Sequence, residues 1–99
     1  MDRRERLHAV LRGESIDRVL CGFWNHFSSE QWYGKAAVQA HVDYYHKVKP
    51  DMLKVMNEHL YRLEKPISHV SDWKGIKALP WESTGYEQYL EEFRMLRRE

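Results

Sequence analysis

Two apolar stretches of the chain, residues 19–24 and 51–56, are each followed directly by polar side chains that could take part in acid–base chemistry. These side chains are Asn25 and His26 after the first stretch, and Asn57, Glu58 and His59 after the second. A histidine exchanges protons near neutral pH, and a partly buried carboxylate can titrate or orient a substrate amine. The pattern therefore favours a general acid–base site if the two segments meet in space. The alternative is that both segments are solvated or hydrogen-bonded loops without a catalytic role.

Lys54 interrupts the second apolar stretch and is a further candidate for chemistry. Because side chains alternate along a strand, Lys54 and Glu58 share one face, whereas Leu53 and Val55 share the other. If the apolar face is covered by a helix, Lys54 and Glu58 point to the interior or the mouth of the fold. Lys54 could then pair with Glu58 or hold a substrate carboxylate. Alternatively, Lys54 extends into solvent from an edge strand.

The elements that must position these side chains follow one another as strand, helix and strand. The runs 19–24 and 51–56 have the length and apolar character of buried strands. Between them, residues 35–48 repeat apolar or aromatic side chains at helical spacing, and Pro50 ends this helix. The order predicts two adjacent parallel strands joined by a right-handed crossover. Their carboxyl ends then lie together, which would gather the polar residues at one rim.

Two further helices are expected at the ends of the chain. Asp2 with Glu5 forms a capping-box pattern, and an apolar stripe of Leu7, Val10 and Leu11 follows it. Residues 60–80 are predicted to be loop, with one short helical turn at 71–73. Thr84 with Glu87 is a second capping-box pattern. The apolar stripe after it predicts a last helix that runs to the C-terminus.

The composition excludes several classes of partner. Sixteen basic and 15 acidic side chains nearly cancel, so neither nucleic acid nor a membrane is an expected partner. No apolar run approaches the ~18 residues of a membrane span. The lone cysteine, Cys21, cannot form an internal disulfide, and it is expected as a small buried hydrophobe in a reducing compartment. A cytoplasmic location is therefore the expectation.

The histidines do not predict a metal site. No two of the six lie at the spacing of a zinc helix motif with a carboxylate between them, and a second cysteine is missing. Metal ligands are therefore expected to be absent from this chain. Apart from His26 and His59, the histidines are expected at the surface or at an interface: His8, His41, His46 and His69.

Several segments together resemble the opening of the uroporphyrinogen decarboxylase superfamily. They are residues 4–14, 17–19 with the first strand after them, 51–57 and 71–73. The family folds as a (β/α)8 barrel and includes the decarboxylase of haem biosynthesis and zinc-dependent methyltransferases acting with corrinoid and thiol carriers. The resemblance implies that residues 1–99 form a single partial domain: an N-terminal helix followed by the βαβ portion of a TIM barrel, apparently truncated.

The resemblance also implies roles for the polar residues. The family's essential aspartate near the end of the second strand corresponds to Glu58. The segment after the first strand that holds substrate carboxylates corresponds to Trp24-Asn25-His26-Phe27, which lacks the arginine of the decarboxylase. The resulting hypothesis names Glu58, Lys54 and His26 as catalytic, and it assigns substrate binding to the following residues: Asn25, Asn57, His59 and Trp24.

Two functions follow as alternatives. The first is a fragment of a tetrapyrrole decarboxylase or a corrinoid or thiol methyltransferase, inactive by itself, that needs the rest of a barrel or a partner chain and a small-molecule substrate. Within this chain no cofactor is expected, although the methyltransferase branch implies zinc or corrinoid in the whole enzyme. The second is a non-catalytic truncated or accessory chain that binds a partner. Four Trp, six Tyr and three Phe in so short a chain favour an aromatic contact surface.

Overall fold

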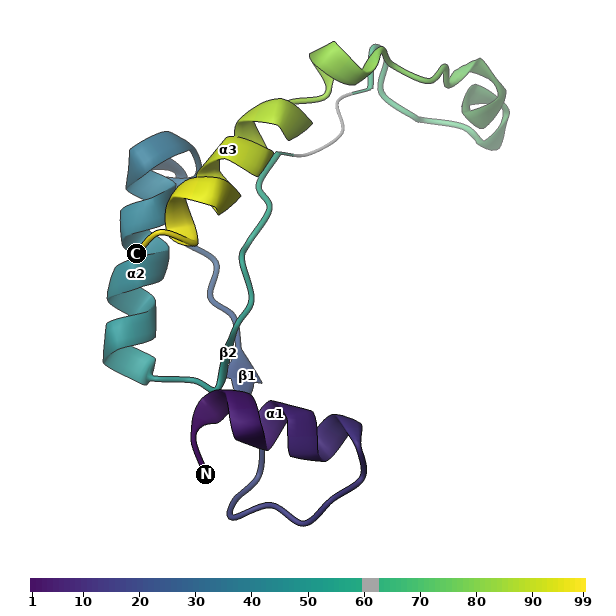
Figure 1. Ribbon diagram of the computed structural model, residues 1–99. Coiled ribbons are helices and arrows are strands. Elements are labelled where there is room, and N and C mark those ends of the chain that lie inside the picture. Colours follow the sequence, from purple (N-terminus) through teal and green to yellow (C-terminus); the bar gives the residue numbers. More distant parts are fainter. Residues whose placement is uncertain (60–62) are drawn as a thin grey trace.

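The computed structural model describes residues 1–59 and 63–99 (Figure 1). In chain order the elements are α1 (Arg3–Leu11), β1 (Gly22–Phe23), η1 (Ser29–Gln31), α2 (Gly34–Val48), β2 (Met52–Leu53), η2 (Val70–Gly75), η3 (Trp81–Ser83) and α3 (Tyr86–Leu96). The three η elements are short 3-10 helices. The chain is thus mainly helical, with one small sheet of two strands next to α1 (Figure 1).

The two strands are parallel neighbours, which confirms the predicted pairing. Gly22 lies opposite Met52 and Phe23 opposite Leu53, and α2 is the crossover between them. Because both strands run in the same direction, their carboxyl ends lie on one side of the sheet.

Both strands are shorter than the apolar runs 19–24 and 51–56 that predicted them. Outside the two paired positions, backbone groups of these runs bind side chains in place of the other strand. The Cys21 N–H donates to the Asp51 carboxylate, and the Met56 N–H donates to the His41 ring. Cys21 was predicted to be buried, but it is only half-buried. It lies just before β1 in a sheet of two strands, which leaves both strands at an open edge.

The first helix begins as predicted but buries a different face. Asp2 accepts the backbone N–H of Glu5 at 2.8 Å and Glu5 accepts that of Asp2 at 2.7 Å, so the predicted capping box is confirmed. The predicted apolar stripe is wrong, because Arg6 and Ala9 are buried whereas Leu11 is 73% exposed. The helix packs through Arg6, whose guanidinium is paired with Asp17, Asp51 and the Met1 carbonyl. A search for apolar residues in the sequence does not find such a buried face.

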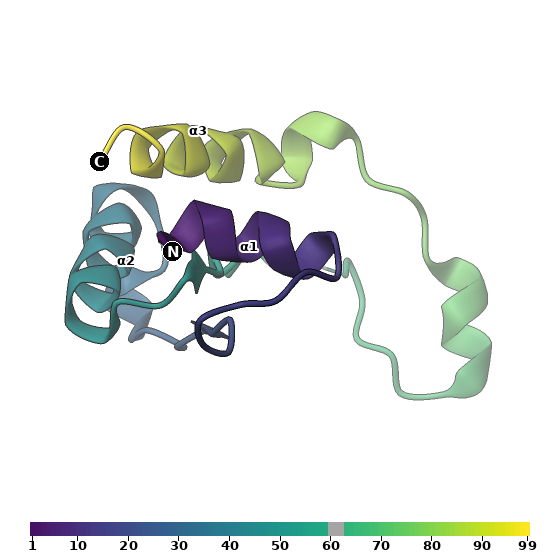
Figure 2. The same ribbon diagram turned by 60° about the horizontal axis from the view of Figure 1, so that its bottom comes forward.

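The largest group of buried residues lies on α2, and α3 packs across the part of α2 that begins at Gly34 (Figures 1 and 2). The buried apolar residues of the described chain are all small: Ala9, Ala37, Val38 and Ala40. His41, expected at the surface or at an interface, is buried at 4% exposure, so a position at the free surface is wrong and the ring packs against other segments of the chain. Small side chains and a polar ring contribute little apolar area, so this packing provides modest stabilisation.

The third helix occupies the predicted segment, but its cap differs. Thr84 donates its hydroxyl to the carbonyl of Trp81 at 2.6 Å, and so it does not cap α3. The N-cap is Gly85, whose φ of 77° lies in the left-handed region that glycine adopts without strain. The predicted Thr84–Glu87 capping box is therefore wrong, because the hydroxyl closes the preceding 3-10 turn.

The described part of the chain is extended. Its radius of gyration is 18.1 Å and its extents are 52 × 32 × 22 Å. A compact domain of 100 residues has a radius of gyration of about 13 Å. The difference arises because residues 63–80 form an arm that projects away from the helices (Figure 1).

The arm covers most of the predicted loop 60–80, of which residues 60–62 lie outside the described residues. The predicted turn at 71–73 lies inside η2, a 3-10 helix of six residues. Membership in a barrel remains a prediction, since the described residues contain two strands.

Candidate functional site

His26 and Glu58 meet at the carboxyl ends of the two strands. Nδ1 of His26 lies 3.2 Å from Oε1 of Glu58, which confirms the predicted approach of the two segments. The Glu58 side chain is only 12% exposed, whereas that of His26 is 73% exposed. An ionised carboxylate only accepts, so Nδ1 carries the proton in this contact and Nε2 is left to exchange a proton with a ligand.

Trp24 and Lys54 form a second pair on the same two segments. The ammonium of Lys54 lies 4.3 Å from the centre of the Trp24 ring, within cation–π range. The indole is 57% exposed and Lys54 is also exposed. The structure thus places the lysine on an aromatic face where the sequence suggested a Glu58 partner. A cation over a flat apolar ring can bind an anionic group attached to a planar ligand.

The other predicted binding residues are placed differently. Asn57 accepts the backbone N–H of His59 at 2.9 Å, a local turn contact, and Asn25 is exposed. The His59 ring is 6% exposed, with its Nε2 3.0 Å from Oε2 of Glu92 on α3. It also contacts the ring of Tyr33, centre to centre, at 4.9 Å. The predicted substrate-binding role of His59 therefore fits its position poorly, because the imidazole is buried in a helix interface.

Glu92 on α3 joins two other segments of the chain at this interface. Its second oxygen accepts the backbone N–H of Gly34, the first residue of α2, at 2.6 Å. The carboxylate therefore ties α3 both to the start of α2 and to the loop that follows β2 through His59. Tyr33 adds a hydroxyl bond to the carbonyl of Glu58 at 3.2 Å. These contacts hold the segment that carries Glu58 against the helices.

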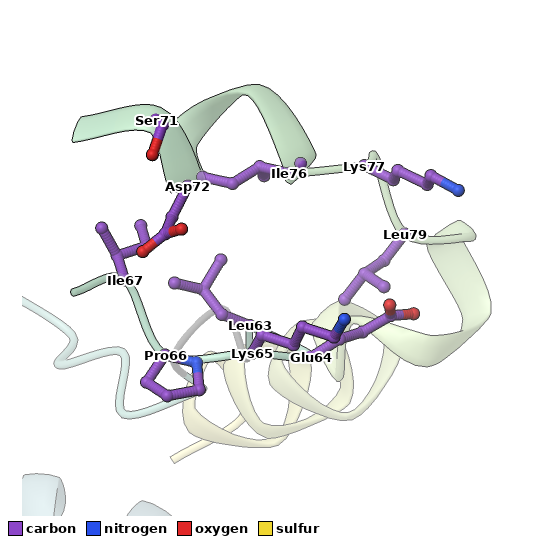
Figure 3. Close-up of a pocket in the computed structure, with 11 residues that line it drawn as sticks. Leu63, Glu64, Lys65, Pro66, Ile67, Ser71, Asp72, Ile76, Lys77 and Leu79 are labelled. Carbon is purple, nitrogen blue, oxygen red and sulfur yellow. The ribbon is translucent and has the colours of Figure 1, made fainter. Parts of the chain in front are cut away.

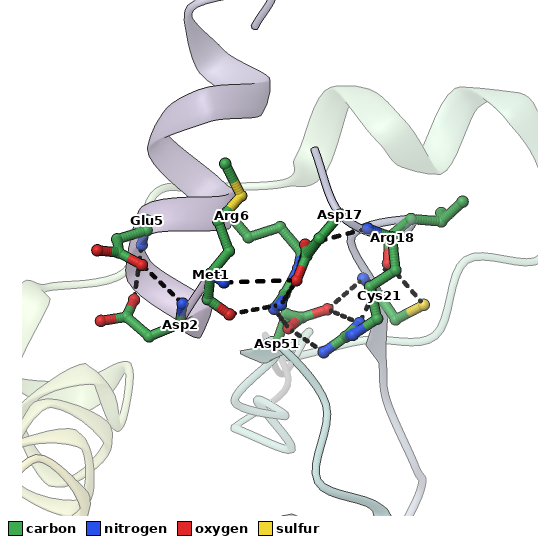
Figure 4. A network of polar contacts seen from close by, with 9 residues as sticks. Met1, Asp2, Glu5, Arg6, Asp17, Arg18, Cys21 and Asp51 are labelled. Carbon is green, nitrogen blue, oxygen red and sulfur yellow. Dashed lines mark hydrogen bonds and ion pairs between the residues drawn. The ribbon is translucent and has the colours of Figure 1, made fainter. Parts of the chain in front are cut away.

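An ionic cluster at the opposite end of the sheet was missed by sequence reasoning (Figure 4). The Asp51 side chain is fully buried. Its carboxylate accepts hydrogen bonds from Arg6 at 2.7 Å, from Nη1 and Nη2 of Arg18 at 2.6 and 2.7 Å, and from the Cys21 N–H at 2.9 Å. Asp17 pairs with Arg6 at 2.7 Å. The cluster joins α1, the connector after it and the start of β2.

The cluster changes the acidity of its members. Hydrogen bonds from Arg18 and then from the Cys21 N–H lower the pKa of Asp51 to about 2. The hydrogen bond from Arg6 holds the pKa of Asp17 well below its usual range, and Asp17 in turn raises the pKa of Arg6. All three groups therefore stay charged at neutral pH, as a structural cluster requires.

The arm encloses a cavity of about 450 Å³ between its two limbs (Figure 3). The lining mixes apolar side chains, such as Leu63 and Leu79, with charged ones, such as Lys65 and Asp72. Asp72 is already occupied, because it accepts the backbone N–H groups of Ser68 and His69. The cavity shares no lining residue with the strand segments, and it has no part in the site built on them.

Metal and membrane functions receive no support from the residues that the structure describes. Within 1–59 and 63–99, no three His, Cys, Asp or Glu side chains form a group that could hold a metal ion. No helix in the same ranges is long and apolar enough to cross a membrane.

Comparisons with protein-family models, with curated proteins and with solved structures each gave no match. The function of the chain is therefore inferred from the geometry of the site and from the sequence resemblance.

Proposed function

We propose that this chain supplies the first strand–helix–strand unit of a parallel α/β enzyme of the uroporphyrinogen decarboxylase type. The observation that carries the proposal is the His26–Glu58 contact of 3.2 Å at the carboxyl ends of two parallel strands. Ligands of parallel α/β folds bind at this edge, and in barrels the catalytic residues lie there. A buried carboxylate that orients an exposed imidazole is a suitable general acid–base pair.

In this proposal the two pairs have separate tasks. Lys54 over Trp24 binds a carboxylate carried by a planar ring of the substrate, such as a pyrrole ring of a tetrapyrrole. Loss of CO₂ breaks a carbon–carbon bond and leaves its electron pair on carbon, and His26 delivers a proton to that carbon. Glu58 orients the imidazole and stabilises its protonated form.

Binding of a tetrapyrrole carboxylate tests the proposal directly. Uroporphyrin, the oxidised and unreactive form of the substrate, should quench the tryptophan fluorescence of the protein, and Lys54→Met should weaken this binding about tenfold through loss of the ion pair. Lys35→Met, a change at an exposed lysine of α2, is the matched control and should bind normally. Equal binding by the Lys54→Met variant would contradict the assignment.

A binding module is the second candidate, and a specific observation favours it. Large aromatic side chains are exposed on well-separated parts of the described chain, among them Phe23 at 57%, Trp73 at 63% and Trp81 at 53%. Exposed aromatic surface of this kind usually contacts another protein surface. If uroporphyrin fails to bind the native protein, this second function replaces the enzymatic one.

A further inference from the structure

The outer face of α3 carries an apolar stripe that nothing in the described structure covers. Tyr86, Leu90 and Phe93 follow one another at i, i+4 and i+7, and they are 42%, 41% and 41% exposed. Trp81 extends the stripe, because its ring stacks on Tyr86 with centres 5.4 Å apart and planes 5° apart. Residues at this spacing share one side of a helix. We name these four residues the α3 stripe.

The stripe is distinct from the face by which α3 packs on the rest of the chain. The inward face contains the buried Glu92 and the half-buried Tyr89, which both contact His59. In Figure 2, α3 lies along one border of the molecule, and no ribbon lies beyond it. The helix therefore packs on the described chain through the face that contains Glu92 and Tyr89, and the α3 stripe on its other side stays exposed.

Charges beside the stripe are separated along the helix. Glu87 lies in its first turn and Glu91 at its middle, whereas Arg94 lies in its last turn and Arg97 and Arg98 follow its end. Glu91 and Arg94 are exposed and 3.3 Å apart, with side-chain exposures of 55% and 61%. A surface that is acidic at one end and basic at the other complements itself when two copies run in opposite directions.

We propose that the α3 stripe is a self-association surface on which α3 of a second copy packs antiparallel. Leu90 of each copy then lies against Phe93 of the other, while Glu91 of each copy faces Arg94 of the other. A parallel arrangement would place like charges together and is disfavoured. The occupant is a second copy because one two-fold axis satisfies the apolar stripe and both charged ends at once.

The size of the surface sets the expected affinity. A helix of 11 residues is about 16 Å long. Two helices of this length bury less surface against each other than the roughly 1,200 Å² typical of stable complexes. A dissociation constant on the order of 10 μM is therefore expected for the dimer. Sedimentation velocity of the full chain from about 1 to about 500 μM should therefore show a monomer converting to a dimer, as that affinity requires.

Charge reversal tests the antiparallel register. In a homodimer, Glu91→Arg brings arginines of the two copies together at two places, and Arg94→Glu does the same with glutamates. Each variant should therefore dimerise at least about tenfold more weakly. When the two variants are mixed, the substituted side chains at positions 91 and 94 face each other with opposite charges. The native Arg94 of one copy faces the native Glu91 of the other in the same dimer. A heterodimer should then form with near wild-type affinity, a recovery that an unfolded variant could not show.

The ion pair between Arg12 and Glu14 offers a matched control. Its side chains are 58% and 52% exposed, close to the values for Arg94 and Glu91, but it lies at the end of α1. Arg12→Glu and Glu14→Arg should leave self-association unchanged. A monomer at every concentration would overturn the proposal. The same conclusion would follow from a dimer insensitive to both α3 reversals, or from variants that fail to recover on mixing.

Discussion

The backbone N–H of Met56 donates to Nε2 of His41 at 2.9 Å, and this contact links the segment after β2 to the centre of α2. Nδ1 of the same ring lies 2.7 Å from the carbonyl oxygen of Ala37. Because a carbonyl only accepts, Nδ1 carries the proton and the neutral ring uses Nε2 as an acceptor. Phe27, the neighbour of His26, packs edge-on against the ring at 4.8 Å. His41 thus supports both segments of the His26–Glu58 pair.

Replacing His41 should loosen the segment that carries Glu58. His41→Phe keeps the aromatic contact with Phe27 but leaves the Met56 N–H without its acceptor, at a cost of about 1–3 kcal/mol. Hydrogen exchange measured by NMR should therefore become faster at the Met56 amide, whereas the amides of α1 should exchange as before. His46→Phe, on an exposed position of the same helix, is the control. Unchanged exchange at Met56 would show that the ring nitrogen is dispensable.

Glu58→Gln should separate catalysis from folding. The amide keeps the size of the side chain but cannot stabilise a protonated His26, so CO₂ release from uroporphyrinogen by the complete enzyme that contains this unit should fall about 100-fold or more. The unfolding free energy should change by less than about 1 kcal/mol. Glu82→Gln, in an exposed turn outside the site, is the control. Wild-type turnover in the Glu58 variant would remove this residue from the site.

The Asp51 cluster should make the fold sensitive to acid. The pKa of Asp51 in the folded chain is about 2, below its ordinary value of 3.8. A depressed carboxyl pKa stabilises the folded state fully above the ordinary value, and this contribution is lost as the pH falls through about 2. Circular dichroism should therefore show a loss of helix across that range. Asp51→Asn should lower stability at neutral pH and flatten the acid transition, whereas Asp43→Asn, at an exposed site on α2, should leave both unchanged.

The Glu92 carboxylate should be needed for its hydrogen bonds more than for its charge. Glu92→Leu leaves the Gly34 N–H and the His59 ring without their buried partner, which should cost about 1–3 kcal/mol for each group. Glu92→Gln retains an acceptor for Gly34 and a donor for His59, so most of the lost stability should return. Urea denaturation of the two variants measures this difference. If Glu92→Gln lost as much unfolding free energy as Glu92→Leu, the negative charge of Glu92, and not its hydrogen bonds, would be the source of the stabilisation.

Features that depend on neighbouring residues and on chain order could be predicted from the sequence. The Asp2–Glu5 capping box needs only residues three apart, and it was predicted correctly. The crossover helix between two apolar runs was sufficient to predict parallel strands. The meeting of the two polar segments followed from this order, because both come after the apolar runs, and the structure shows that His26 and Glu58 are a pair in contact.

Which polar groups are buried became known only from the folded chain. The Arg6–Asp51 and His59–Glu92 contacts join residues 45 and 33 positions apart, and no local periodicity marks such pairs. A pattern that places apolar residues inside therefore selected Leu11 for the buried face of α1, where Arg6 is found, and left His41 for the surface or an interface. Paired polar groups can be buried because their partners replace water, and those partners are identified only when the distant segments are brought together.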